Sequence, residues 1–174
     1  MGNYKDTFRK AILLRNYNRN LRKWSELPFL KRLFTRKPRA PFKGDAIATN
    51  EAAAAKAFHE EASRALLNNY EETTPYGEIF ATSVYYNAEP GHDNLMPVLI
   101  GRYFDGSCWF VERTLIRHDG SVKQWGVDYP YSECGVTGLP QEDALPEKFR
   151  QPLRDFRRAL DELRDMVREN ADIL

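Results

Sequence analysis

The sequence has few of the residues that build metal sites and disulfide frameworks. Its 174 residues include only two cysteines and three histidines. Cys108 and Cys134 are too few and too far apart for a disulfide scaffold or a zinc site, both of which need clustered ligands. We expect both to be free, buried thiols. We therefore expect no cofactor and no bound metal.

Long apolar runs are also missing. The longest, such as residues 11–14 and 98–100, fall far short of the roughly 18 residues that span a bilayer, so we expect no transmembrane segment. The N-terminus lacks the apolar stretch of a secretory signal. These absences predict a soluble protein of the cytoplasm or another reducing compartment, such as an organelle matrix or a virion, and not a secreted protein.

Catalytic motifs are scarce as well. There is no phosphate-cradling glycine loop and no G-x-S-x-G turn. His59 lies on a predicted helix whose residue 63 is serine, where a zinc protease motif needs its second histidine, so we interpret it as a half-exposed helix residue. His92, His118 and Cys134 fall in predicted loops and turns. A pocket that brings these three together would indicate a small enzyme or ligand-binding domain, but we assign no catalytic residue.

Positive charge is abundant, and it is concentrated at one end of the chain. The first 43 residues contain 13 of the 26 Lys and Arg residues but only two of the 25 Asp and Glu residues. The remaining chain is acidic, so the net charge of +1 hides a strong asymmetry. Such a segment repels itself unless something anionic lies near it. We therefore expect residues 1–43 to bind an anionic partner.

The basic segment also has an apolar side. Apolar residues spaced by three and four predict one amphipathic helix over residues 4–24, ended by Pro28. A short apolar and basic turn is expected at residues 29–34, followed by a linker that Pro38 and Pro41 keep extended. We call the apolar side of the helix the docking stripe; it consists of Tyr4, Phe8, Leu14, Tyr17, Leu21 and Trp24.

The bases on the other faces are the predicted contacts to the anionic partner. We call them the basic set; it consists of Arg9, Lys10, Arg15, Arg19, Arg22, Lys23, Lys31, Arg32, Arg36, Lys37 and Arg39. Nucleic acid, an anionic membrane surface and an acidic protein all fit such a set. Nucleic-acid arms are usually polar all round, whereas the docking stripe implies that one side packs on protein or lipid.

The rest of the chain predicts one further domain. Ala-rich residues 50–70 predict a helix, which Thr49 or Asn50 can cap. Alternating β-branched and aromatic residues predict strands between residues 79 and 127, with hairpin turns at the Asp-Gly pairs 105–106 and 119–120. Apolar spacing predicts a last helix over residues 152–170. We predict an α+β fold: an antiparallel meander of about four strands packed on these two helices, with residues 1–43 as a docking arm and 44–174 as a single domain.

These features favour one function over two others. We predict a non-enzymatic structural or accessory subunit, docked into a larger multi-protein assembly through its basic amphipathic N-terminal helix. The alternative is a nucleic-acid-binding accessory or regulatory protein that uses the same arm. The third hypothesis is the small enzyme or ligand-binding domain near His92, His118 and Cys134.

Overall fold

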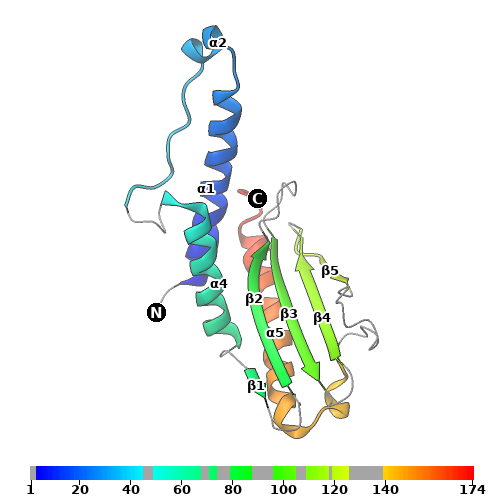
Figure 1. Cartoon of the computed structure of the whole chain (residues 1–174). Helices are drawn as coiled ribbons and strands as arrows, with labels where there is room; N and C mark the ends of the chain where they lie inside the picture. The colour runs from blue at the N-terminus through cyan, green and yellow to red at the C-terminus, as the bar shows by residue number, and fades with distance from the viewer. Residues whose placement is uncertain are drawn as a thin grey trace. The chain divides into compact units, whose positions relative to one another are not determined.

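The computed structural model describes residues 3–44, 49–67, 71–73, 79–87, 96–104, 109–117, 119–125 and 139–174. The chain divides into two compact units (Figure 1). The first comprises Met1–Phe58 and Ile173, and the second comprises His59–Asp172 and Leu174. The boundary falls inside a helix, so each unit is described by itself.

The first unit is helical. It contains α1 (Tyr4–Ser25), α2 (Phe29–Phe34) and the first half of α4 (Glu51–Leu67). Asn3 caps α1, because its side-chain oxygen accepts a hydrogen bond from the backbone N–H of Lys5 at 3.2 Å. The bounds of α1 lie within one residue of the predicted range, residues 4–24.

Helices α1 and α4 pack on each other through large and small side chains. The rings of Phe8 and Phe58 lie with their centroids 5.2 Å apart, and both side chains are fully buried. Ala11, Leu14 and Ala54 form a second buried cluster, and Phe42, from the segment that joins the two helices, packs against it. The alanines let the two helices approach closely while the aromatic pair fills the space beside them.

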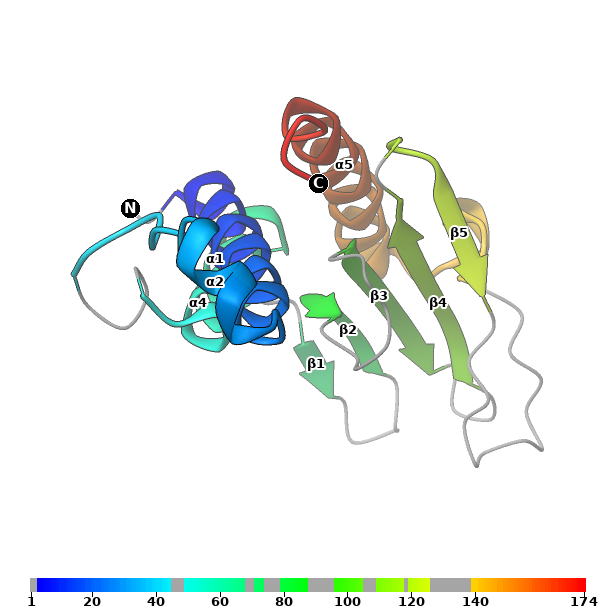
Figure 2. The same cartoon turned by 90° about the horizontal axis from the view of Figure 1, so that it is seen from above.

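The described residues of the second unit form the second half of α4, an antiparallel sheet and a long C-terminal helix. The strands are β1 (Glu71–Thr73), β2 (Ile79–Asn87), β3 (Met96–Phe104), β4 (Trp109–Ile116) and β5 (Val122–Trp125). Each strand pairs with the next along the chain, in the order β1-β2-β3-β4-β5. A short 3-10 turn, η1 (Glu142–Ala144), precedes helix α5 (Glu147–Glu169), which packs on β2, β3 and β4 (Figure 2).

The core of this unit lies between α5 and β3. Tyr103, Leu145, Phe149 and Leu153 form a buried cluster, with the ring of Tyr103 edge-on to that of Phe149 at 5.4 Å between centroids. At Gly101 of β3 a Cβ atom would lie 2.5 Å from a methyl carbon of Leu139 and 3.0 Å from the ring of Phe156. Only glycine gives α5 and the preceding segment room to approach the strand at this point.

The chain mixes helices and strands as predicted, but the predicted arrangement of four strands on two helices is wrong. Among the described residues the four helices contain more residues than the strands, and the sheet has five strands instead of about four. Helix 50–70 was expected to cover the sheet beside helix 152–170. Its first half, through Phe58, instead belongs to the first unit and packs on α1. The apolar side of this helix packs against Phe8 and Ala11 of α1, so α1 and α4 form a helical hairpin.

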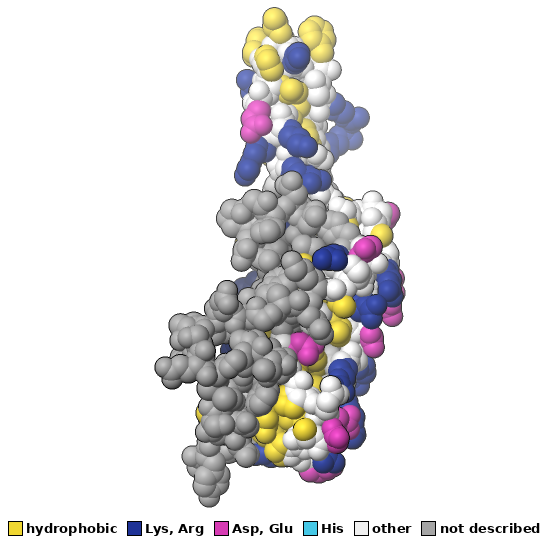
Figure 3. All heavy atoms as spheres, turned by 90° about the vertical axis from the view of Figure 1, so that its right-hand side faces the viewer, with side chains coloured by type: hydrophobic (Ala, Val, Ile, Leu, Met, Phe, Trp, Pro, Cys, Tyr) yellow, Lys and Arg dark blue, Asp and Glu magenta, His cyan; other side chains and the backbone are white. Residues whose placement is uncertain are grey.

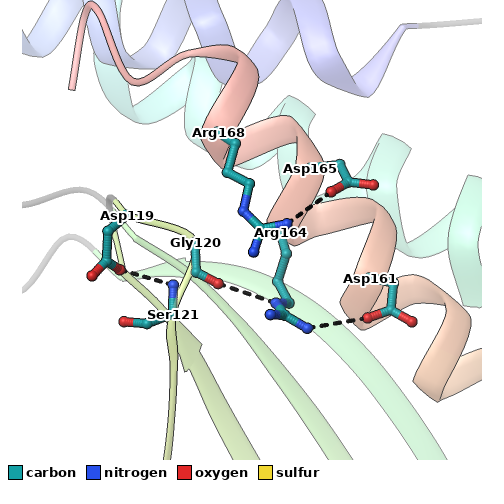
Figure 4. A network of polar contacts seen from close by, with 7 residues as sticks. All are labelled: Asp119, Gly120, Ser121, Asp161, Arg164, Asp165 and Arg168. Atoms are coloured by element: carbon teal, nitrogen blue, oxygen red, sulfur yellow. Dashed lines mark hydrogen bonds and ion pairs between the residues drawn. The ribbon is translucent and has the colours of Figure 1, made fainter.

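A hydrogen bond and side-chain contacts join the β4–β5 turn to α5 (Figure 4). Gly120 has a positive φ of 75°, and Asp119 accepts a hydrogen bond from the N–H of Ser121 at 2.8 Å. Arg164 of α5 donates its Nε–H to the carbonyl oxygen of Gly120 at 3.1 Å, and the side chain of Arg168 lies against the same glycine. The predicted turn at residues 105–106 lies outside the described residues.

Candidate docking surface

Helix α2 presents a cluster of exposed apolar side chains. Phe29, Leu30, Leu33 and Phe34 expose 68%, 70%, 62% and 90% of their surface, and we call these four residues the apolar tip. Within the described part of the chain, the one other exposed large hydrophobic side chain is Val122, at only 37%. Figure 3 shows hydrophobic side chains gathered at this end of the first unit. A grouped apolar surface of this kind usually marks a binding site.

Helical geometry puts the apolar tip on one side of α2. At about 100° per residue, the four side chains cover an arc of about 140°, while Lys31 and Arg32 point to the opposite side. The helix is thus amphipathic on its own, although it has only six residues.

Trp24 holds α2 against the end of α1 in a defined orientation. Its indole N–H donates a hydrogen bond to the carbonyl oxygen of Thr35 at 2.9 Å. The guanidinium of Arg32 and the ammonium of Lys37 lie 5.9 Å and 5.8 Å from the centre of its ring, within cation–π distance. Because Arg32 faces the indole, the opposite side of α2, which carries the apolar tip, faces away from α1.

The apolar tip borders a hollow that is open to solvent. Leu27, Leu30, Lys31, Phe34 and Thr35 line it, and its volume is about 290 Å³. This space can accept an apolar side chain or the end of a hydrocarbon chain, with a lysine ammonium beside it.

The segment that contains the apolar tip is rich in bases. Residues 20–44 contain eight Lys and Arg residues and a single acid, Glu26. The bases are Arg22, Lys23, Lys31, Arg32, Arg36, Lys37, Arg39 and Lys43; all are exposed except Arg32, which is partly buried. This end of the first unit therefore combines exposed apolar side chains with an excess of positive charge.

The docking stripe divides into a covered half and a partly open half. Phe8 and Leu14 are buried in the α1–α4 hairpin. Tyr4, Tyr17 and Leu21 are partly buried, as is Trp24, which holds α2. The apolar contact that we assigned to an outside partner is thus supplied, over the first half of α1, by α4 of the same chain.

The basic set is spread over the whole first unit. Arg9, Arg19, Arg22, Lys23, Lys31, Arg36, Lys37 and Arg39 are exposed, and Lys10, Arg15 and Arg32 are partly buried. Seven of these eleven bases lie within residues 20–44, the segment that contains the apolar tip. The apolar tip itself was not among the predicted site residues, because six residues are too few to show helical periodicity. The available signal was the run of apolar and basic residues that starts directly after Pro28.

The other predicted site residues contribute less. His59 is partly buried, its Nδ1 has no hydrogen-bond partner, and burial lowers its pKa below 6.5 against the opposing charge of Glu60. His92, His118, Cys108 and Cys134 lie outside the described residues. Among the residues that the structure describes, no three His, Cys, Asp or Glu side chains gather as metal ligands. No helix in the described segments is long and apolar enough to cross a membrane.

No family model matches the chain, and no match was found among curated proteins or solved structures. Its function is therefore inferred from the chemistry of its own surfaces.

Proposed function

We propose that the protein is a non-enzymatic accessory subunit that docks onto a larger multi-protein assembly through its N-terminal unit. The observation that supports this most is the apolar tip, whose four side chains are 62–90% exposed and lie in a segment rich in exposed bases. The non-enzymatic part of the proposal rests on the sequence, which contains no catalytic motif.

The energy available at this surface is large enough for docking. Covering a fully exposed Leu or Phe side chain contributes about 1.5–3 kcal/mol, so covering these four partly exposed side chains contributes about 4–9 kcal/mol before the cost of association is subtracted. Trp24 already fixes the orientation of α2 through its bond to Thr35, so less conformational freedom is lost on binding. An unfolded basic tail would lose much more conformational freedom on binding.

The test is the size of the complex that the full-length chain forms in the organism that encodes it. A tagged chain is compared with a tip variant, in which Phe29, Leu30, Leu33 and Phe34 are each changed to Gln. Glutamine keeps the helix propensity and removes the apolar surface. Val122→Ser is the matched control, because it removes exposed apolar surface from β5 instead.

We expect the wild type and the Val122→Ser control to fractionate in a complex far larger than 20.2 kDa, and the tip variant to fractionate near that mass. A wild-type chain that always fractionates as a monomer would reject the proposal. If nuclease treatment releases the wild type from its complex, the partner is nucleic acid, and the alternative function replaces this one.

A further inference from the structure

We propose that the apolar tip inserts into the surface of an anionic lipid bilayer while the bases around it bind the headgroups. This inference rests on the proposed function, because it takes the N-terminal unit as the docking element. It places the assembly on a membrane, so that the chain joins the assembly by inserting the apolar tip into the bilayer beside it.

The form of the tip fits a bilayer. Phe34 is 90% exposed, so it contacts almost nothing of its own chain, and its three apolar neighbours are more than 60% exposed. A protein partner must offer a groove shaped for such side chains, whereas lipid chains rearrange around them. Interfacial helices lie in the plane of the membrane and bury one apolar face about 5–10 Å deep, and the four exposed side chains on one side of α2 form such a face.

The arrangement of the charges fits as well. The bases come from three consecutive segments: the end of α1 with Arg22 and Lys23, α2 with Lys31, and the following chain with Arg36 and Arg39. The Arg32 guanidinium and the Lys37 ammonium lie over the Trp24 ring, behind the side of α2 that carries the apolar tip. Bases behind an inserted tip would lie at the level of the anionic headgroups.

Trp24 connects α2 with the bases behind the apolar tip. The Arg32 guanidinium and the Lys37 ammonium lie 5.9 Å and 5.8 Å from the centre of its ring, and its N–H is hydrogen-bonded to the Thr35 carbonyl oxygen. An indole with an apolar body and a satisfied polar edge is well suited to the boundary between hydrocarbon and headgroups. Lysine side chains next to it can extend their ammonium groups toward phosphates while their methylene groups stay in the apolar layer.

Nucleic acid fits the same surface less well. A phosphate backbone would engage the bases, but it would leave the four apolar side chains of the tip facing water or charge. The hollow beside Leu30 and Phe34 is apolar with one lysine at its edge, which suits a hydrocarbon chain with a phosphate above it.

The experiment measures the partition of the full-length protein onto vesicles of phosphatidylcholine, alone or with about 30 mol% phosphatidylserine, by flotation at low salt. The tip variant tests insertion. A charge variant, Arg22→Gln, Arg36→Gln and Arg39→Gln, tests headgroup contact, and Lys56→Gln, Arg64→Gln and Arg157→Gln is its matched control. Circular dichroism checks that each variant remains folded. A Phe34→Trp variant with lipids brominated on the acyl chain reports the depth of insertion.

We expect at least about tenfold stronger partition onto the anionic vesicles, at least about tenfold loss in the tip variant, and a loss of several fold in the charge variant but not in its control. We also expect bromine to quench the fluorescence of Phe34→Trp more than that of the wild type. Equal partition of the wild type and the tip variant would overturn insertion, and so would the absence of extra quenching. Preference for nucleic acid over vesicles in a competition experiment would overturn it too.

Different experimental results would reject the lipid inference and the proposed function. If the chain ignores anionic vesicles but still fractionates in a large complex that the tip variant cannot join, the lipid inference is rejected and the proposed function stands with a protein partner. If the wild type binds vesicles but never fractionates in a larger complex, membrane binding stands and the accessory-subunit function falls.

Discussion

The pairing of α1 with α4 predicts that a substitution in α4 loosens α1. Phe58 and Phe8 are fully buried, and their rings lie 5.2 Å apart at the centroids. Replacing a buried phenylalanine with alanine costs about 3–5 kcal/mol through lost burial and the remaining cavity. For Phe58→Ala we expect the free energy of opening α1 to fall by about that amount, a large part of the stability of a small domain.

Hydrogen exchange measures this locally. The backbone amides in the middle of α1, near Leu14, should exchange about two to three orders of magnitude faster in Phe58→Ala than in the wild type. Phe34→Ala is the matched control: it removes an aromatic ring that is 90% exposed, so exchange near Leu14 should not change. An independent arm, as the sequence alone predicts for residues 1–43, would show no response to Phe58→Ala.

A double-mutant cycle identifies the contact itself. If Phe8→Ala and Phe58→Ala act on the same ring pair, their combined effect should differ from the sum of the single effects by about 0.5–1.5 kcal/mol. Additive effects, or unchanged exchange near Leu14 in Phe58→Ala, would refute the helical hairpin.

Three further predictions follow from single contacts. Trp24→Phe removes the N–H that binds the Thr35 carbonyl oxygen, so the amides of α2 should lose protection from exchange while those near Leu14 keep theirs. Gly120→Ala should lower the free energy of unfolding by about 1–3 kcal/mol in urea denaturation, because alanine is strained at a φ of 75° and its Cβ would lie 2.5 Å from Nε of Arg168. The hydrogen bond from Arg154 lowers the pKa of Glu142 below 4.5, so this pair stabilises the fold above pH 4.5 and ceases to do so as the pH falls through the lowered value; Arg154→Gln should return the pKa toward 4.5 in a carboxyl NMR titration.

Local patterns predicted the individual elements well. The spacing of Phe8, Leu14 and Leu21 gave α1 to within a residue at each end, because three or four residues per repeat is a property of the helix itself. Helix α5 starts at Glu147, five residues before the predicted start, so Pro152 lies inside it. Asp119 and Gly120 form the turn between β4 and β5, since a positive φ at that position requires glycine.

The partners of the apolar surfaces could not be predicted. An apolar side on a helix shows that something covers it, but not what. Phe8 belongs to the docking stripe, which we assigned to an outside partner, and Phe58 lies on the helix that we assigned to the sheet. The two rings instead cover each other. The apolar tip was missed for the opposite reason: Phe29 and Phe34 are exposed, and exposure of large apolar side chains is a property of the folded surface that a short segment does not reveal.

The ion pairs of α5 bear on the question of which anionic partner the basic residues 1–43 bind. One possibility is the acidic remainder of a second copy of this protein. Along α5, however, arginines of the same helix already engage acidic side chains, in the pairs Glu147–Arg150, Asp155–Arg158, Asp161–Arg164 and Asp165–Arg168. Such surface pairs contribute little to stability, but they neutralise the helix locally. Around the apolar tip, by contrast, eight bases accompany one acid. The positive charge there requires an anionic partner, and the vesicle experiment separates a bilayer from the acidic remainder of a second copy, whose excess of acids lies outside α5.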